Sequence, residues 1–139
     1  MRIEALILTR DEAANLADCV HSVRPAVDEI TVFDTGSRDN TSALTRELGV
    51  RWVPIPWRSD FAQARNLALQ QLHGDWILVI DADERLAQDS AVKLRSFLQR
   101  AGNMEEILFL EKRTYTDDVD SLGYVGMSAD ESMRRGAGG

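Results

Sequence analysis

The sequence predicts an α/β domain built on a mostly parallel sheet with helices on both faces. Short apolar runs alternate with segments in which apolar residues recur at the helical period. Because each helix can carry the chain back to the start of the next strand, this alternation favours parallel pairing. With 139 residues and 44% hydrophobic residues, the chain is long enough to bury one core.

The apolar runs place the strands, and the periodic segments place the helices. We expect strands at 3–8, 30–33, 51–55, 76–80 and about 106–112. We expect helices from the acidic turn 9–12 to Pro25, from a cap at Asp39 or Asn40 to Leu48, from a cap at Asp60 to Gly74, and from about Asp89 to Arg100. Gly36 is expected to permit a tight turn, and Gly49 to end a helix.

Pro54 determines the expected order of the strands. A proline removes a donor from the hydrogen-bond ladder, so the strand at 51–55 belongs at a sheet edge. The order third, second, first, fourth then follows, with the switch point between the first and fourth strands. Two helix faces are expected to be apolar, formed by Leu16, Cys19, Val20 and Val23 and by Phe61, Ala64, Ala68 and Leu72.

The stretch 74–84 carries the strongest chemical signal. Residues 76–80 are apolar without a break, which predicts a strand covered on both faces. It ends at Asp81 and Asp83, whose side chains point to one side because side chains alternate along a strand. Carboxylates without Cys or His nearby suit Mg²⁺ or Mn²⁺ rather than zinc.

Three strand ends are expected to line one crevice, formed by residues 9–12, Asp34 and the Asp81–Asp83 pair. So much acid is unfavourable unless a cation or a hydrogen-bonding ligand is bound. Taken alone, the pair is equally a solvated turn, and Asp34 is either a turn or capping residue or an acceptor for a base N–H or a ribose hydroxyl. Arg65 and Asn66, taken alone, favour a solvated helix face.

Several other side chains are expected to have no chemical role. Cys19 is interpreted as a core residue, and His21 and His73 as surface residues. Trp52, Trp57 and Trp76 are interpreted as packing residues, although an exposed Trp57 could stack on a sugar.

Charge, cysteine count and motifs exclude several classes. A net charge of −7 with no basic cluster argues against a nucleic-acid binder. One cysteine permits no internal disulfide, and no apolar run is long enough to span a bilayer or to serve as a signal peptide, so a cytoplasmic location is expected. Neither Gly-x-Gly-x-x-Gly nor Gly-x-x-x-x-Gly-Lys-[Ser/Thr] is present, so phosphates would have to be neutralised by a metal.

Four linked segments together resemble the family 2 glycosyltransferases of the GT-A fold, a Rossmann-like α/β fold. They are Leu6–Glu12, Val32–Thr41, Asp60–Asn66 and Gly74–Glu84, and their order and spacing match across about residues 3 to 115. The resemblance implies a nucleotide-diphospho-sugar donor, most often a UDP-sugar, and a divalent metal, Mn²⁺ or Mg²⁺, at the Asp81-Ala82-Asp83 motif.

The resemblance also implies roles for single residues. Thr9 and Glu12 would lie near the base and ribose, Asp34 near the base, and Arg65 near the nucleotide. Asp81 would lie near the ribose or sugar and share the metal site with Asp83. Asp11 and Thr35 belong to the same nucleotide-sugar site, although Asn and a second Asp are usual at these two positions.

Family members carry a second half that binds the acceptor and supplies the catalytic base. We expect residues 1–115 to form the nucleotide-sugar-binding domain and 116–139 an irregular tail that begins a missing half, so the chain is expected to be truncated and to bind donor without transferring sugar. No catalytic base is therefore assigned. The acceptor, a saccharide, lipid or protein, stays open, and an uncovered sheet edge favours homo-oligomers. Two other functions stay open: an aspartyl phosphohydrolase, and a non-catalytic nucleotide-binding domain.

Overall fold

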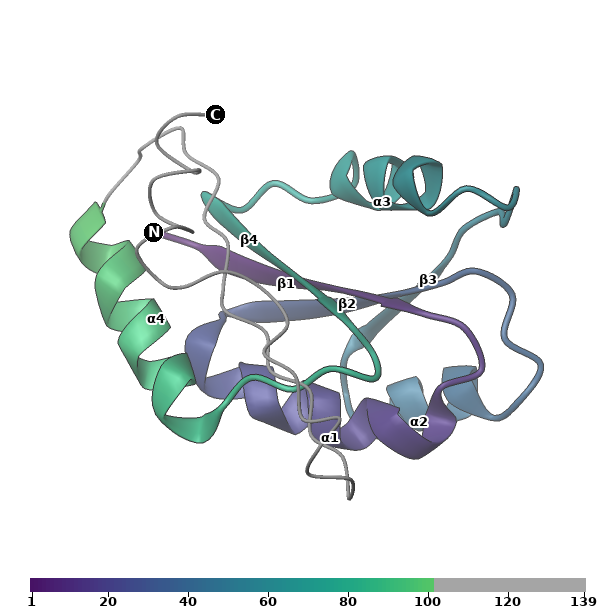
Figure 1. The fold of residues 1–139 in the computed structure, drawn as a ribbon, viewed down its shortest axis with the longest axis horizontal. Coiled ribbons are helices and arrows are strands. Elements are labelled where there is room, and N and C mark those ends of the chain that lie inside the picture. Colours follow the sequence, from purple (N-terminus) through teal and green to yellow (C-terminus); the bar gives the residue numbers. More distant parts are fainter. Residues whose placement is uncertain (102–139) are drawn as a thin grey trace, which may run out of the picture. The chain divides into compact units, whose positions relative to one another are not determined.

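A computed structural model describes residues 1–101 of the chain (Figure 1). The elements are β1 (Ile3–Thr9), α1 (Ala13–Val23), the 3₁₀ turn η1 (Arg24–Ala26), β2 (Glu29–Asp34), α2 (Thr41–Glu47), β3 (Arg51–Pro54), α3 (Phe61–Leu69), β4 (Trp76–Asp81) and α4 (Gln88–Ala101). The predicted fifth strand, the boundary at residue 115 and the tail lie outside the described residues. Within 1–101, no helix has the length and apolarity needed to cross a bilayer.

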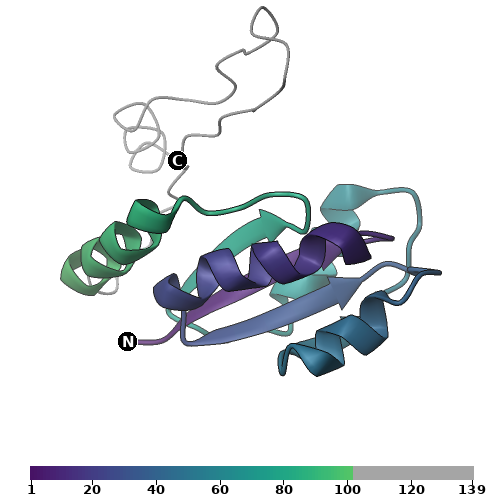
Figure 2. The ribbon, with the colours of Figure 1, turned by 90° about the horizontal axis from the view of Figure 1, so that it is seen from below.

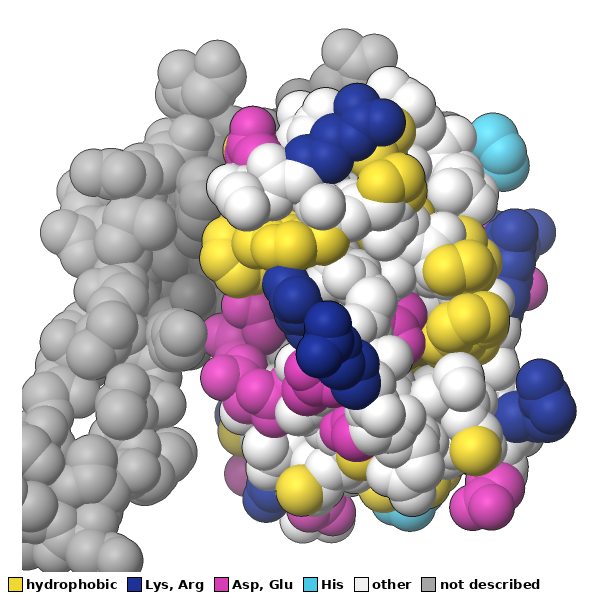
Figure 3. Space-filling model, turned by 90° about the vertical axis from the view of Figure 1, so that its right-hand side faces the viewer, with side chains coloured by type: hydrophobic (Ala, Val, Ile, Leu, Met, Phe, Trp, Pro, Cys, Tyr) yellow, Lys and Arg dark blue, Asp and Glu magenta, His cyan; other side chains and the backbone are white. Residues whose placement is uncertain are grey.

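The four strands pair in parallel in the order β3-β2-β1-β4. This confirms the predicted order, with the proline-containing β3 at one edge. Thr9 is the register partner of Asp34, and Leu8 is the partner of Asp81. The carboxyl ends of β1, β2 and β4 therefore lie side by side, at the end of the sheet that is turned towards the viewer in Figure 3.

Helices cover both faces of the sheet, as predicted. Helix α3 lies on one face, and α1, α2 and α4 lie on the other (Figures 1 and 2). The inner face of α1 is fully buried, which confirms the predicted apolar face, and it consists of Leu16, Cys19, Val20 and Val23. Beside α3, one hydrophobic cluster joins helix and sheet, made of Leu6, Leu8, Phe33, Ile55, Ala64, Ala68 and Leu72.

Strand β4 is less covered than its apolar sequence predicts. Among the described strands it pairs with β1 alone, so it lies at an edge of that sheet. Trp76, Ile77 and Leu78 are half-buried, and Val79 is 40% exposed. The expectation of a strand covered on both faces is wrong for β4 in this part of the chain. Strand β1, in contrast, is covered on both faces, because all seven of its residues are buried.

Helix α3 begins where predicted but differs in its end and in the burial of its first residue. It ends at Leu69 rather than near Gly74. Asp60 caps its start as predicted, because its Oδ1 accepts the N–H of Gln63 at 3.1 Å. The assignment of Phe61 to the buried face is wrong, since this first residue of the helix is 66% exposed.

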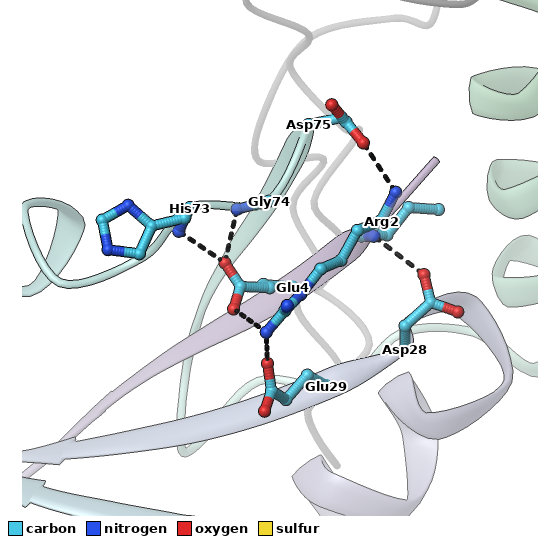
Figure 4. A network of polar contacts seen from close by, with 8 residues as sticks. Arg2, Glu4, Asp28, Glu29, His73, Gly74 and Asp75 are labelled. Carbon is cyan, nitrogen blue, oxygen red and sulfur yellow. Dashed lines mark hydrogen bonds and ion pairs between the residues drawn. The ribbon is translucent and has the colours of Figure 1, made fainter.

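A polar network fixes β4 beside β1 at the amino end of the sheet (Figure 4). The carboxylate of Glu4 on β1 is buried, and its Oε2 accepts the N–H groups of His73 and Gly74 at 2.9 and 2.6 Å. Its Oε1 accepts a hydrogen bond of 3.2 Å from Arg2, which also pairs with Glu29 on β2. These contacts determine how β4 enters the sheet and so where its acidic end emerges.

Candidate functional site

A pocket of about 290 Å³ lies at the carboxyl end of the sheet. It is lined by Leu8, Thr9, Arg10, Glu12, Thr35, Trp57, Phe61, Asp81, Ala82 and Asp83. Of the residues predicted from the sequence, the pocket brings together Thr9, Glu12, Thr35, Asp81 and Asp83. Asp11, Asp34 and Arg65 are not among its lining residues. Figure 3 shows acidic, basic and hydrophobic side chains gathered on this face.

A larger hollow of about 430 Å³ lies at the opposite end of β2 and β3, and three of its four charged residues, all but Arg51, already have partners among the described residues. Arg24 donates to the carbonyl of Leu48 at 2.6 Å, and Asp28 accepts from Arg95 at 2.7 Å. Glu29 pairs with Arg2. Charged groups that are paired within the protein have few free donors or acceptors for a ligand, so we assign the functional site to the smaller pocket.

The acidic loop begins where β4 ends. Ala82 is buried and its N–H donates to the carbonyl of Leu8 at 3.3 Å, whereas Asp81 and Asp83 on either side of it are exposed. Glu84 closes the turn, because its Oε1 accepts the N–H of Asp81 at 2.8 Å and its own N–H donates to the carbonyl of Asp81 at 2.9 Å. This alternation leaves both carboxylates at the pocket.

Thr9, which lines the same pocket, has a buried hydroxyl. The residue is 4% exposed, and its Oγ1 has no hydrogen-bond partner among the described residues. The neighbouring Thr35 donates its hydroxyl to the carbonyl of Thr9 at 3.3 Å rather than to the Thr9 hydroxyl. An unsatisfied buried hydroxyl is costly, so a polar ligand that reached it would gain a hydrogen bond.

Asp34 is 3% exposed and already has three donors. Its Oδ1 accepts the N–H groups of Gly36 and Ser37 at 3.0 and 2.7 Å, and its Oδ2 accepts Nε1 of Trp52 at 3.1 Å. Gly36 has a φ of 108°, so this turn needs glycine, as predicted. Trp52 is 39% exposed, so it makes a polar contact at the surface rather than the packing expected of it.

Asp11 and Asp39 join the first two strand-to-helix loops. Oδ1 of Asp11 accepts the N–H groups of Arg38 and Asp39 at 2.6 and 3.3 Å. In return, Asp39 accepts the N–H of Ala13, the first residue of α1, at 3.1 Å and that of Thr41, the first residue of α2, at 3.0 Å. Of the two cap candidates, Asn40 occupies the N-cap position of α2 without a side-chain capping bond, whereas Asp39 accepts the first N–H of the helix. The two carboxylates hold the loop that carries Glu12 against the loop that carries Thr35.

The donor atoms at the acidic loop suit a hard divalent cation. Asp81 and Asp83 offer carboxylate oxygens, and Mg²⁺ or Mn²⁺ takes one or two such ligands with phosphates and waters. No group of three or more His, Cys, Asp or Glu side chains gathers at metal-binding distance within residues 1–101. Cys19, whose Sγ lies 3.5 Å from the carbonyl of Asp81, does not suit a hard cation, because such ions prefer oxygen ligands. Burial and the nearby carboxylates raise the pKa of its thiol to about 12.

Sequence reasoning missed an aromatic wall of the pocket. The guanidinium carbon of Arg10 lies 5.6 Å from the ring centroid of Trp57, and the ring of Trp57 meets that of Phe61 edge-on at 4.8 Å. Arg10 directly follows the end of β1, which is the signal that could have revealed it. His21 and His73 are exposed and Cys19 is buried, as predicted. Arg65 and Asn66 are exposed on α3.

The family of the chain is shown by comparison with known sequences. Glycosyl transferase family 2 matches residues 5–118, so the chain belongs to this family. A TPR repeat-containing protein of Synechococcus elongatus is 44% identical over 99 residues, which cover 71% of this chain and 25% of that protein. An uncharacterized glycosyltransferase of Rickettsia felis is 40% identical over 88 residues, covering 63% and 31%. The chain therefore spans about a quarter to a third of the length of these relatives.

Solved structures agree on the GT-A fold. TarS of S. aureus, residues 1–349, has a TM-score of 0.68 at 17% identity and covers 81% of this chain and 36% of that one. Glucosyl-3-phosphoglycerate synthase of Mycobacterium tuberculosis, solved with Mn²⁺, UDP and glucosyl-3-phosphoglycerate, has a TM-score of 0.50 at 29% identity and covers 58% and 33%. The fold expected from the resemblance is confirmed.

Proposed function

We propose that this chain forms the donor site of a glycosyltransferase that uses a nucleotide-diphospho-sugar, with a UDP-sugar as the first candidate. The observation that carries the proposal is the pocket itself. It combines the exposed carboxylates of Asp81 and Asp83 with the unpartnered hydroxyl of Thr9, at the switch point of a parallel sheet. The synthase that shares the fold at 29% identity was solved with Mn²⁺ and UDP, which supports the same ligands here.

Each residue has a proposed task. Asp83, together with Asp81, would hold the divalent ion, which supplies positive charge to the diphosphate leaving group. Asp81 would also orient the ribose or sugar by hydrogen bonding. Thr9 and Glu12 would contact the ribose and base. Thr35, which lines the pocket beside Thr9, would belong to the same contact surface.

Three predicted residues lie outside the pocket lining and receive different proposals. Asp34 would select the base, using the acceptor capacity that its Trp52 bond leaves on Oδ2. Arg65 would reach the nucleotide from α3 only when the ligand extends beyond the pocket. Asp11 would act through the loops that it holds together. The acceptor, whether saccharide, lipid or protein, and the base that deprotonates it stay unassigned.

A thermal-shift panel tests this proposal. The 139-residue chain is heated with UDP, GDP or inorganic phosphate, each with and without Mn²⁺. Because a ligand that binds only the folded state raises the melting temperature, the proposal expects stabilisation by UDP that depends on Mn²⁺. Stabilisation by phosphate alone would favour the phosphohydrolase instead. Equal stabilisation by UDP with and without metal would contradict the metal assignment.

A further inference from the structure

We propose that Arg10 is a phosphate-binding residue of this pocket, held in place by the ring of Trp57. This inference rests on the proposed function, because it assigns Arg10 to the diphosphate of the donor. It adds a protein cation to a site whose only other proposed positive charge is the metal. The ligand chemistry it requires is a phosphate-bearing molecule.

The first support is the way Arg10 is held. Its guanidinium lies over the face of Trp57, 5.6 Å from the ring centroid, and Trp57 is itself braced by the edge of Phe61 at 4.8 Å and an interplanar angle of 63°. All three residues line the pocket. A guanidinium held over a ring by a cation–π contact spends no N–H group on a hydrogen bond to an acceptor, so its donors stay available to a ligand.

The second support is the pairing that Arg10 does not make. Glu12, Asp81 and Asp83 line the same pocket, yet Arg10 forms no ion pair or hydrogen bond with another described residue. Some arginines of this part of the chain are paired, Arg85 with Asp18 at 3.0 Å and Arg95 with Asp28 at 2.7 Å, and others, such as Arg46, are not. What distinguishes Arg10 is that it stays unpaired while it lines a pocket with three carboxylates. A planar fork of donors suits the bidentate binding of phosphate.

The third support is the balance of charge. The carboxylates of Asp81 and Asp83 together cancel the two charges of a divalent ion. Glu12 adds a third carboxylate to the lining, so without Arg10 a diphosphate that bound this ion would meet a site of net negative charge. Arg10 is the basic residue among the lining residues, so it is the group that can restore attraction for the diphosphate.

The experiment is calorimetric titration of the 139-residue chain with UDP, uridine and inorganic pyrophosphate, each in excess Mn²⁺. The variants are Arg10→Ala, Arg10→Lys, Trp57→Leu and the double variant. Arg46→Ala, on the exposed side of α2 and outside the pocket, is the control for lost charge. Because Arg10 is exposed, its variants should melt at the same temperature as the parent chain.

We expect Arg10→Ala to weaken the binding of UDP and of pyrophosphate by about 10- to 100-fold, the range for hydrogen bonds to charged groups. The affinity for uridine should change little. Arg10→Lys should retain part of the affinity, because it keeps the charge but not the planar fork. Trp57→Leu should weaken pyrophosphate binding by about 2- to 5-fold. Because the ring acts through Arg10, the double variant should bind pyrophosphate no more weakly than Arg10→Ala alone.

The outcomes separate this inference from the proposed function. If the parent chain binds UDP and Arg10→Ala loses no more UDP affinity than the control Arg46→Ala, the Arg10 assignment is wrong and the donor site stands. If pyrophosphate binds in an Arg10-dependent way but UDP adds nothing over pyrophosphate, the assignment stands and the nucleotide donor is wrong. If the parent chain binds neither phosphate compound, both are overturned.

Discussion

Asp34 and Trp52 are joined across neighbouring strands, because the indole N–H of Trp52 on β3 donates a hydrogen bond of 3.1 Å to Oδ2 of Asp34 on β2. The other oxygen of Asp34 accepts two N–H groups of the following turn. Asp34 therefore secures both the edge strand and the loop that carries Thr35. Substitution of Asp34 thus removes hydrogen bonds within the fold as well as any contact with a base.

Trp52→Phe separates these two roles. The substitution keeps most of the ring but removes the N–H, so we expect a loss of about 1 kcal/mol in the free energy of unfolding and little change in UDP affinity. Asp34→Ala should lower the free energy of unfolding further and weaken UDP binding by about 1–3 kcal/mol. Urea denaturation and calorimetry measure the two quantities. Parent-like UDP affinity in Asp34→Ala would show that Asp34 is a turn residue.

The buried Glu4 makes stability depend on pH. Burial alone would raise the pKa of Glu4, but hydrogen bonds from Gly74 and His73 and the charge of Arg2 outweigh it, so its pKa is lowered in the folded chain. The unfolded chain then takes up the proton first as pH falls. The stability due to Glu4 is therefore present above its ordinary pKa of 4.5 and is lost as pH falls through the folded value.

Glu4→Gln should isolate this contribution. The amide keeps one acceptor oxygen for the N–H groups of His73 and Gly74 but loses the charge, so we expect a cost of about 1–2 kcal/mol at pH 7. The difference from the parent chain should shrink below pH 4.5. Glu47→Gln, on the exposed side of α2, is the control and should follow the parent at every pH. A difference that is constant from pH 7 to pH 3 would rule out this linkage.

Cys19 should be unreactive in the folded chain. The thiol is fully buried on the inner face of α1, and burial and the carboxylates of the acidic loop raise its pKa to about 12. Because the thiolate is the reactive form, iodoacetamide at pH 8 should modify Cys19 only in denaturant. Mass spectrometry follows the modification. Rapid alkylation without denaturant would mean that Cys19 is not buried as described.

The sequence predicts the convergence of strand ends but not the contacts of the loops. Strand and helix alternation with an edge proline is enough to order the sheet, and the order alone brings Thr9, Asp34 and Asp81 together. The partners of Asp11 are backbone N–H groups of a distant loop. Such partners leave no periodic signal, so no pattern could have identified them.

Two misplaced aromatic residues show the limit of periodicity. The period places Phe61 on the same helix face as Ala64 and Ala68, but it does not say where the sheet beneath the helix ends. The first turn of α3 meets the pocket rather than the sheet, so Phe61 lies against Trp57. In the same way, nothing in the spacing of Arg10 and Trp57 indicates that the two side chains stack.

The most direct test of the donor-site proposal is the affinity of UDP for the parent chain and for Asp83→Asn, measured by calorimetry with and without Mn²⁺. Asp83 is exposed and makes no hydrogen bond or ion pair with other described residues, so the variant should melt like the parent chain. It exchanges a charged metal ligand for a neutral group of the same shape. We predict that Mn²⁺ tightens UDP binding in the parent chain and not in the variant. Equal enhancement by Mn²⁺ in both proteins would contradict the assignment of the metal to Asp83.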